Sequence, residues 1–237
     1  MRGRADESGV VFVGPTLAPC PRARARVRPL RLRPPVKRSD VARWIDTHDE
    51  PGIIVIVDGV FHDTLAVGHA EIRDALRRGF RVWGLSSMGA IRAREMSALG
   101  MRGFGEVFDR FVHEDDFQDD EVALLHEPTP PYRAVTEPLV HLRAALEHLV
   151  ARAIVRERDA AAVLADLKSR WYGDRTVRGT IDALVRRDPA CADAVHNELR
   201  DIRRFAIKTL DLERFLDERP WEEGARAAPN HPHPSCS

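Results

Sequence analysis

The sequence is poor in cysteine, and its three cysteines, Cys20, Cys191 and Cys236, lie far apart. An odd number of scattered cysteines argues against a disulfide framework and favours a reducing compartment. The chain also lacks an apolar run of the roughly 20 residues that a membrane-spanning helix requires. Its first residues carry mixed charge where a secretory signal would have an apolar segment. We therefore expect a cytoplasmic protein with no membrane partner.

Familiar nucleotide and metal motifs are missing as well. No G-x-G-x-x-G follows a predicted strand and no Walker loop is present, which disfavours a standard nucleotide site. The cysteines and histidines show no zinc-binding spacing. Lys plus Arg and Asp plus Glu both number 37, and this balance argues against nucleic acid as a partner. The sequence predicts no cofactor and no metal.

Charge is nevertheless uneven along the chain. Arg22–Arg38 contains eight basic residues and no acidic one, whereas Glu106–Glu121 contains eight acidic residues and only Arg110 as a Lys or Arg. These segments are interpreted either as solvated faces or as surfaces that meet each other or a partner. The 237 residues, 43% of them hydrophobic, suffice for one core domain with a helical appendage.

Short apolar runs alternate with helical patterns in the first half of the chain. Ile53–Val57 consists of five β-branched residues without alternation, which indicates a strand of a parallel sheet buried on both faces. Further strands are predicted at Val10–Val13 and Phe80–Leu85, with an edge strand near Leu30–Leu32. Helices are predicted from Ser39 or Asp40 (carrying Val41, Trp44 and Ile45 on one face), at His69–Arg78 and at Ala90–Leu99. The fold class is α/β, an open and mostly parallel sheet with flanking helices.

The second half of the chain is predicted to be mainly helical. Gly100–Gly105 is predicted to be a loop and Val122–His126 a candidate further strand, and a helical pattern begins at Glu137. Later helix patterns cover Ala160–Trp171, Val177–Arg187 and Ala190–Phe215. The predicted organisation is a disordered end (1–9), an α/β core domain (10–133), a helical subdomain (134–223) and a disordered tail (224–237).

Candidate functional residues gather after the predicted strands. Ligands of open α/β sheets lie beyond the carboxyl ends of the strands. Gly14 and Thr16, Asp58, and the turn Ser86-Ser87-Met88-Gly89 all fall there, and Lys37 can join them from its loop. We expect these segments to form one site.

The two serines stand at the step from strand to helix, where helix amides lack internal partners. Ser87 is the candidate nucleophile with Ser86 beside it, and the amides around Met88 and Gly89 are candidate oxyanion donors. The pattern is close to the G-x-S-x-G elbow, but Leu85 replaces the first glycine. The alternative is an ordinary helix cap.

Several residues are candidates for a base or a binding group. The candidate bases are His62, His69, His126 and Lys37, the lysine having a surface-charge alternative. Asp58 is interpreted as orienting a base, binding a hydroxyl or forming a turn with Gly59. Arg92 and Glu95 either pair with each other or the arginine faces an anion. Asp119–Glu121 has no spacing specific enough to name a metal.

Five segments together carry a resemblance to a known family. Their order and approximate spacing resemble the TfuA-like family over roughly residues 10–145. The segments are Val11–Leu17, Pro34–Arg38, Val57–Phe61, Ser86–Ala90 with Arg92 and Glu95, and Asp119–Ala123. The sequence departs from the family pattern at Ser39, Leu85 and Met96.

The resemblance implies a partner of YcaO-type enzymes, which activate backbone amides with ATP in thioamide formation on ribosomal peptides. In that setting the TfuA-like protein is thought to release sulfide by hydrolysing a thiocarboxylated sulfur-carrier protein, with the precursor peptide contacted indirectly. It implies Ser87, Ser86, Lys37 and Asp58 as catalytic residues. Gly14, Thr16, Met88, Gly89, Arg92 and Glu95 would then bind substrate. The alternatives are a non-catalytic adaptor that binds YcaO or the carrier, and a domain that binds a small anion.

Overall fold

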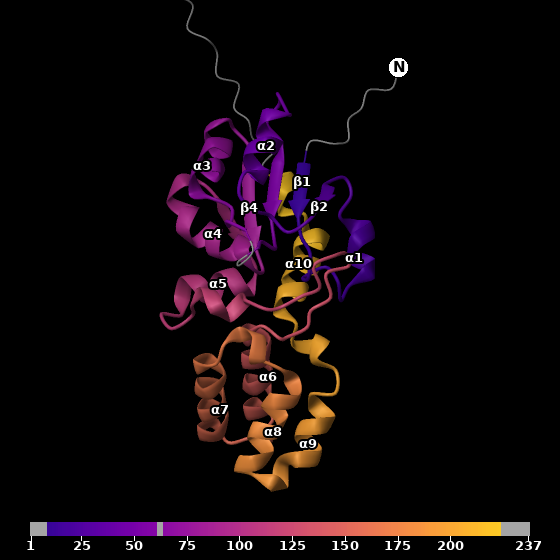
Figure 1. The fold of residues 1–237 in the computed structure, drawn as a ribbon, viewed down its shortest axis with the longest axis vertical. Coiled ribbons are helices and arrows are strands. Elements are labelled where there is room, and N and C mark those ends of the chain that lie inside the picture. The colour runs from indigo at the N-terminus through magenta and orange to yellow at the C-terminus, as the bar shows by residue number, and fades with distance from the viewer. Residues whose placement is uncertain (1–8, 61–63, 224–237) are drawn as a thin grey trace, which may run out of the picture.

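A five-stranded, all-parallel sheet forms the upper half of the protein in the computed structural model, which describes residues 9–60 and 64–223 (Figure 1). The strand order is β2-β1-β3-β4-β5. The strands are β1 (Gly9–Phe12), β2 (Arg31–Arg33), β3 (Ile53–Ile56), β4 (Arg81–Leu85) and β5 (Arg102–Phe104). The predicted α/β class is confirmed, and β2 is an edge strand as expected. Residues 1–8 and 224–237 of the predicted ends, and His62, lie outside the described residues.

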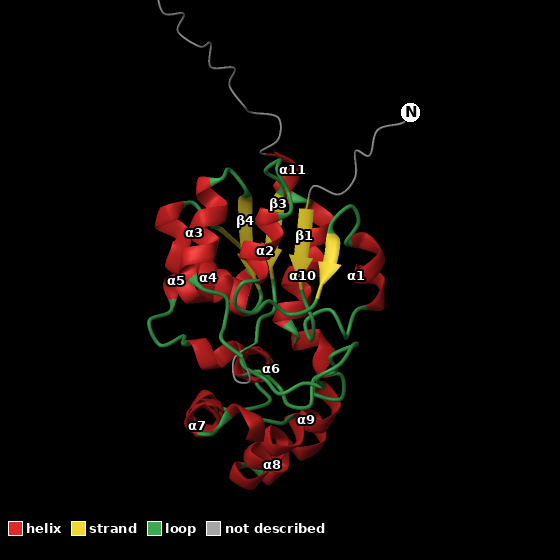
Figure 2. Ribbon diagram, turned by 45° about the horizontal axis from the view of Figure 1, so that its top comes forward, coloured by secondary structure: helices red, strands yellow, loops and turns green. Residues whose placement is uncertain are grey.

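The helices cover both faces of the sheet and form a separate cluster below it (Figures 1 and 2). Those around the sheet are α1 (Pro21–Arg26), α2 (Asp40–Asp46), α3 (His69–Arg77), α4 (Met88–Met96), α5 (Glu106–His113), α10 (Ile207–Glu218) and α11 (Pro220–Glu223). Those below it are α6 (Leu139–Ala151), α7 (Glu157–Ser169), α8 (Val177–Arg187) and α9 (Ala192–Glu198).

Successive residues of the central strands pack into two different cores, because side chains alternate across a sheet. On one face Ile54 and Ile56 pack with apolar side chains of α2, α3 and α4. On the other face Ile53, Val55 and Val57 pack with α1 and α10. The unbroken β-branched run therefore reflects burial on both faces.

Helix α2 is capped by a neighbouring helix. Ser39 has φ 70° and makes no capping bond with its side chain. The carboxylate of Glu71, at the start of α3, accepts from the amides of Ser39, Val41 and Ala42. A carboxylate at a helix N-terminus satisfies amides that have no partner within the helix. The predicted side-chain cap by Ser39 is replaced by this long-range one, while Asp40 accepts from the Lys37 amide at 2.9 Å.

Two sequence-based expectations about strands differ from the structure. The predicted loop Gly100–Gly105 contains β5, which pairs with β4 through Trp83–Arg102 and Leu85–Phe104. A three-residue strand with a central glycine has no hydrophobic pattern to reveal it. Val122–His126 is not a strand of the sheet: Val122 ends a 3₁₀ helix, Asp119–Val122, and His126 forms only an isolated bridge to Ala134.

The last long helix returns to the sheet. Although α10 lies within the range predicted as a helical subdomain, its Leu212, Phe215 and Leu216 belong to the core on the second sheet face. Ala190–Phe215 is interrupted between α9 and α10, where the chain crosses from the lower helices to the sheet. The boundary at residue 133 stays a prediction. Helices α6 to α9 have a core of their own.

No helix among residues 9–60 and 64–223 is both long enough and apolar enough to cross a membrane.

The N-terminus of helix α4 lies directly against the backbone of the sheet. A Cβ placed on Gly89 would stand 1.8 Å from the Ile56 carbonyl oxygen, and one on Gly84 would stand 2.0 Å from the Gly89 oxygen. These are backbone atoms that a side-chain rotation cannot move. The two glycines therefore allow the α4 N-terminus to approach the ends of β3 and β4.

We predict that Gly89→Ala destabilises the fold by about 3 kcal/mol, because the methyl group forces the helix away from β3. The measurement is the free energy of unfolding in urea. Gly179→Ala in α8 is the matched control, since its Cβ would stand 3.1 Å from a side-chain oxygen, that of Thr176, and not against backbone atoms. We expect no loss there, and an equal loss in both variants would contradict the packing explanation.

Asp211 joins α10 to α5. Its carboxylate accepts from the amides of Glu106 and Val107 at 2.8 and 2.9 Å, which caps α5. Burial is the main cause that raises the pKa of this carboxyl from 3.8 to about 6, against the lowering effect of the two amides. The folded protein therefore holds this proton at a higher pH than the unfolded chain does.

The raised pKa predicts a pH dependence of stability. Between pH 4 and pH 6 the folded state binds the Asp211 proton more tightly than the unfolded chain does. The stabilisation that protonated Asp211 contributes to the folded state is therefore complete below pH 4 and is lost as the pH rises through 6. The wild type should lose about 3 kcal/mol relative to Asp211→Asn across this window. Unfolding free energies at several pH values test it, with the exposed Asp182→Asn as control. A difference that stays constant with pH would contradict it.

Candidate functional site

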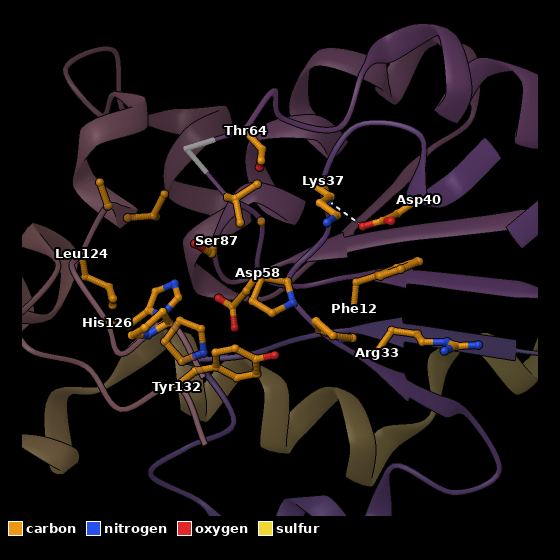
Figure 3. Close-up of a pocket in the computed structure, with 18 of the residues that line it drawn as sticks. Phe12, Arg33, Lys37, Asp40, Asp58, Thr64, Ser87, Leu124, His126 and Tyr132 are labelled. Carbon is orange, nitrogen blue, oxygen red and sulfur yellow. Dashed lines mark hydrogen bonds between the residues drawn. The ribbon is translucent and has the colours of Figure 1, made fainter. Parts of the chain in front are cut away.

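A cavity of about 780 Å³ lies at the carboxyl ends of the central strands (Figure 3). Its walls come from the residues at and after the ends of β1 and β3, the segment from β2 to α2, the start of α4, residues 122–132, Tyr172 and the start of α10. Asp58, Ser87, His126, Tyr132 and Lys37 all line it. The convergence expected from the strand ends therefore occurs, and it includes segments from beyond the sheet.

Asp58 is held by three hydrogen bonds. Its Oδ2 accepts from the amides of Gly14 and Thr16 at 2.8 and 2.9 Å, and its Oδ1 accepts from the Thr16 hydroxyl at 2.6 Å. Only 2% of Asp58 is exposed. Gly14 and Thr16, predicted to bind substrate, thus bind this carboxylate and tie the loop after β1 to the end of β3.

Lys208 faces Asp58 from the first turn of α10. Its Nζ is 4.0 Å from Asp58 Oδ1 and donates to the Val122 carbonyl at 3.0 Å. Burial lowers the pKa of this ammonium, while the Asp58 charge acts in the opposite direction. The pair places two opposite charges in the cavity wall, where the dielectric constant is low and their fields are strong.

The two serines of the turn have different surroundings. Ser86 has φ 65° at the centre of a tight turn, closed by a bond from the Ser87 amide to the Leu85 carbonyl. Its hydroxyl is fully buried and donates to the Lys208 carbonyl at 2.8 Å. Ser87 lines the cavity, and its hydroxyl does not cap α4. Ser86 therefore anchors α10, whereas Ser87 lies in the cavity wall with a hydroxyl that the helix does not use.

The amides expected to stabilise an oxyanion are partly occupied. Gly89 donates its amide to the Val57 carbonyl at 3.2 Å, and Ser87 donates to Leu85. The Met88 amide has no backbone acceptor and no other hydrogen-bond partner among the described residues, which makes it a candidate donor to a ligand. The Met88 side chain is buried against the end of β3, next to Gly59.

Arg92 and Glu95 lie on the outer side of α4 and do not line the cavity. Arg92 donates to the Val67 carbonyl and pairs with Glu95 at 2.6 Å, and Glu95 also contacts His69 at 2.8 Å. Their predicted role in substrate binding stays a prediction and requires a ligand that extends outside the cavity. His69 contacts Glu95 and does not line the cavity that contains Ser87.

Of the two candidate histidines that the structure describes, His126 lines the cavity and His69 does not. Its Nδ1 donates to the Glu127 carbonyl at 2.6 Å, and because a carbonyl only accepts, this bond fixes the proton on Nδ1. Nε2 is then an acceptor. The ring packs edge-on against Tyr132, at 5.8 Å between centroids. In Figure 3 both rings point toward the space around Asp58.

Two of the three acidic residues considered for a metal, Asp120 and Glu121, are used in ion pairs. Glu121 is completely buried and pairs with Arg143, and Asp120 accepts from the buried Arg175 at 2.6 Å. No group of three metal-ligating side chains is found in the part of the chain that the structure describes. The segment links the sheet to α6 and the turn before α8.

The chain has only three lysines, Lys37, Lys168 and Lys208, among its 37 basic residues. Two of the three line the cavity. Lys37 is exposed at its mouth, whereas Lys208 is buried in its wall. Lys208 was not predicted from the sequence. The signal that could have identified it is a lysine inside the mostly apolar run Phe205–Leu210, in a chain whose other basic residues are nearly all arginine.

A family model described as TfuA-like protein matches residues 58–176, half of the chain. The matched range begins at Asp58 and includes Ser86, Ser87 and His126, but not Lys37 or Lys208. No curated protein matches the chain at a significant level.

We predict that Thr16→Val destabilises the protein by about 2 kcal/mol, because it removes the hydroxyl that donates to the buried Asp58 carboxylate while keeping the side-chain shape. Chemical denaturation measures this loss. The exposed Thr129→Val is the matched control and should change stability by less than about 0.5 kcal/mol. Equal stability of the Thr16 variant and the wild type would mean that this hydrogen bond does not hold Asp58.

Proposed function

The chain belongs to the TfuA-like family, and we propose that it releases sulfide from a thiocarboxylated sulfur-carrier protein for a YcaO-type enzyme. Family membership supports the coarser role, an accessory protein in thioamide formation. The observation that carries the finer proposal is the position of Ser87, whose side chain lines a cavity together with His126 and a buried pair of opposite charges.

The reaction proposed is hydrolysis of a thiocarboxylate to a carboxylate and hydrogen sulfide. The Ser87 oxygen attacks the thiocarboxylate carbon, and its proton passes to His126 Nε2. The carbon–sulfur bond then breaks, and the sulfur leaves with that proton as hydrosulfide. Water next attacks the acyl ester, transfers one proton through His126 back to Ser87, and leaves the carrier carboxylate with a released proton.

Two features support these assignments. The bond from Nδ1 to the Glu127 carbonyl orients the His126 ring and leaves Nε2 free to accept a proton. The amide of Met88 is available to the oxygen that becomes negative in the transition state. A single such donor contributes a factor of about 10²–10³ to the rate. Lys37, at the cavity mouth, would attract the anionic end of the carrier.

A second candidate function is a non-catalytic adaptor that binds the YcaO-type enzyme or the carrier. It is favoured by the basic surface of α1 and β2, where Arg24, Arg28 and Arg33 are exposed and have no ion pair among the described residues. Under this alternative the contact is electrostatic and Ser87 is dispensable. Charge reversal at these arginines would then abolish complex formation, and Ser87→Ala would change nothing.

We predict that Ser87→Ala lowers the rate of sulfide release from a thiocarboxylated carrier at least about 100-fold, because the attacking oxygen is removed. His126→Ala should lower it by about 10²–10⁴. Sulfide is measured directly, with and without the YcaO-type partner.

The control is Ser97→Ala, which changes an exposed serine after α4 and should release sulfide like the wild type. Thermal unfolding confirms that each variant is folded. If Ser87→Ala releases sulfide at the wild-type rate, the nucleophile is misassigned. If no variant or wild type releases sulfide even with the partner present, the adaptor function is favoured.

A further inference from the structure

Lys208 is a buried ammonium with too few partners. Only 2% of the residue is exposed, and Nζ makes one hydrogen bond among the described residues, to the Val122 carbonyl. An ammonium has three hydrogens and accepts none. Two donors of Lys208 are therefore left without a protein acceptor within the described chain, and the residue lines the cavity.

The nearby carboxylate does not satisfy these donors. Asp58 Oδ1 is 4.0 Å from Nζ, which is beyond hydrogen-bond distance. Its two oxygens already accept from Gly14 and from the amide and hydroxyl of Thr16. Asp58 thus supplies negative charge to Lys208 but no hydrogen bond.

The other polar groups around Lys208 are also occupied. Glu137, on the segment before α6, contributes a favourable charge, but its carboxylate contacts His141 Nδ1 at 3.2 Å. His141 Nε2 accepts from the backbone amide of Lys208 at 3.4 Å. Ser86 holds the Lys208 carbonyl, and the neighbouring Thr209 hydroxyl donates to the Thr16 carbonyl at 2.9 Å. The main chain of Lys208 is fixed, and its ammonium is directed to the cavity wall.

Leaving a buried charge without hydrogen bonds costs free energy. Here that cost is offset when an anion enters the cavity, because the anion brings both the acceptors and the opposite charge. The lowered pKa of Lys208 has the same origin, desolvation without full pairing. An arginine would spread its charge over a planar group that matches two oxygens, whereas a lysine offers a compact charge to a single small head group.

We propose that Lys208 is the cation that binds the anionic head group of the substrate, a thiocarboxylate before the reaction and a carboxylate after it. This inference rests on the proposed function for the identity of the anion. It assigns a substrate-binding role to a residue outside the range matched by the family model. The α10 helix thereby becomes part of the site.

The scarcity of lysine allows a direct test. In full-length protein labelled with ¹³C-lysine there are three side chains to observe, and Lys37→Arg and Lys168→Arg assign the Lys208 signal by elimination. The Ser87→Ala background prevents turnover. Sodium thioacetate, sodium acetate and neutral acetamide are the probes. We expect the Lys208 ε-methylene signal to shift saturably with both anions and not with acetamide, while the Lys168 signal stays unchanged.

Kinetics of sulfide release provide a second readout, in protein that retains Ser87. Lys208→Met should lower kcat/KM for sulfide release at least about 30-fold, mainly through KM, because a buried charge contact with the substrate is lost. Lys208→Arg should restore part of the affinity. Lys168→Met, outside the cavity, is the matched control and should behave like the wild type.

The outcomes separate this inference from the proposed function. If sulfide release depends on Ser87 but neither anion shifts the Lys208 signal, the binding role of Lys208 is wrong. If the signal shifts with both anions and no sulfide is released, the anion site stands and the hydrolase function fails. Equal shifts of all three lysines would show a general salt effect and overturn the inference.

Discussion

The site depends on the satisfaction of one buried carboxylate. Asp58 ends the central strand, and three donors from the loop after β1 surround it. A buried charge with this many hydrogen bonds has one geometry, so the two strand ends are fixed relative to each other. The wall that contains Ser87 stands on the same strand end, because Gly89 of α4 donates to Val57. The position of Ser87 therefore follows from the position of Asp58.

The features of the fold and of the site that could be predicted from the sequence are those that depend on local residue patterns. The β-branched run of β3 implies a sheet buried on both faces, and the parallel order brings Gly14, Asp58 and Ser87 to one edge. The different roles of Ser86 and Ser87 have no local signal. They depend on the Lys208 carbonyl, 122 residues away along the chain. The strand β5 escaped prediction because three residues with a glycine have no period.

The same distinction separates the catalytic hypothesis from the adaptor hypothesis. An electrostatic contact surface, such as the exposed arginines near α1, needs only charge and exposure, and a composition profile detects it. A reactive site needs a hydroxyl, an acceptor and a cation held in one cavity by different elements. In this protein the turn before α4 holds the Ser87 hydroxyl, the segment before α6 holds the His126 imidazole, and α10 holds the Lys208 ammonium.

The late position of α10 in the chain has a consequence for synthesis on the ribosome. All five strands are made before residue 105, but the helix that covers much of their second face begins at Ile207. The sheet face that carries Val55 and Val57 therefore stays partly uncovered until the last part of the chain is made. A nascent chain of this kind exposes an apolar, aggregation-prone sheet face during translation. Folding of the sheet domain is completed only when α10 is made. A truncation that deletes α10 removes its packing on the sheet and the Lys208 ammonium of the cavity together.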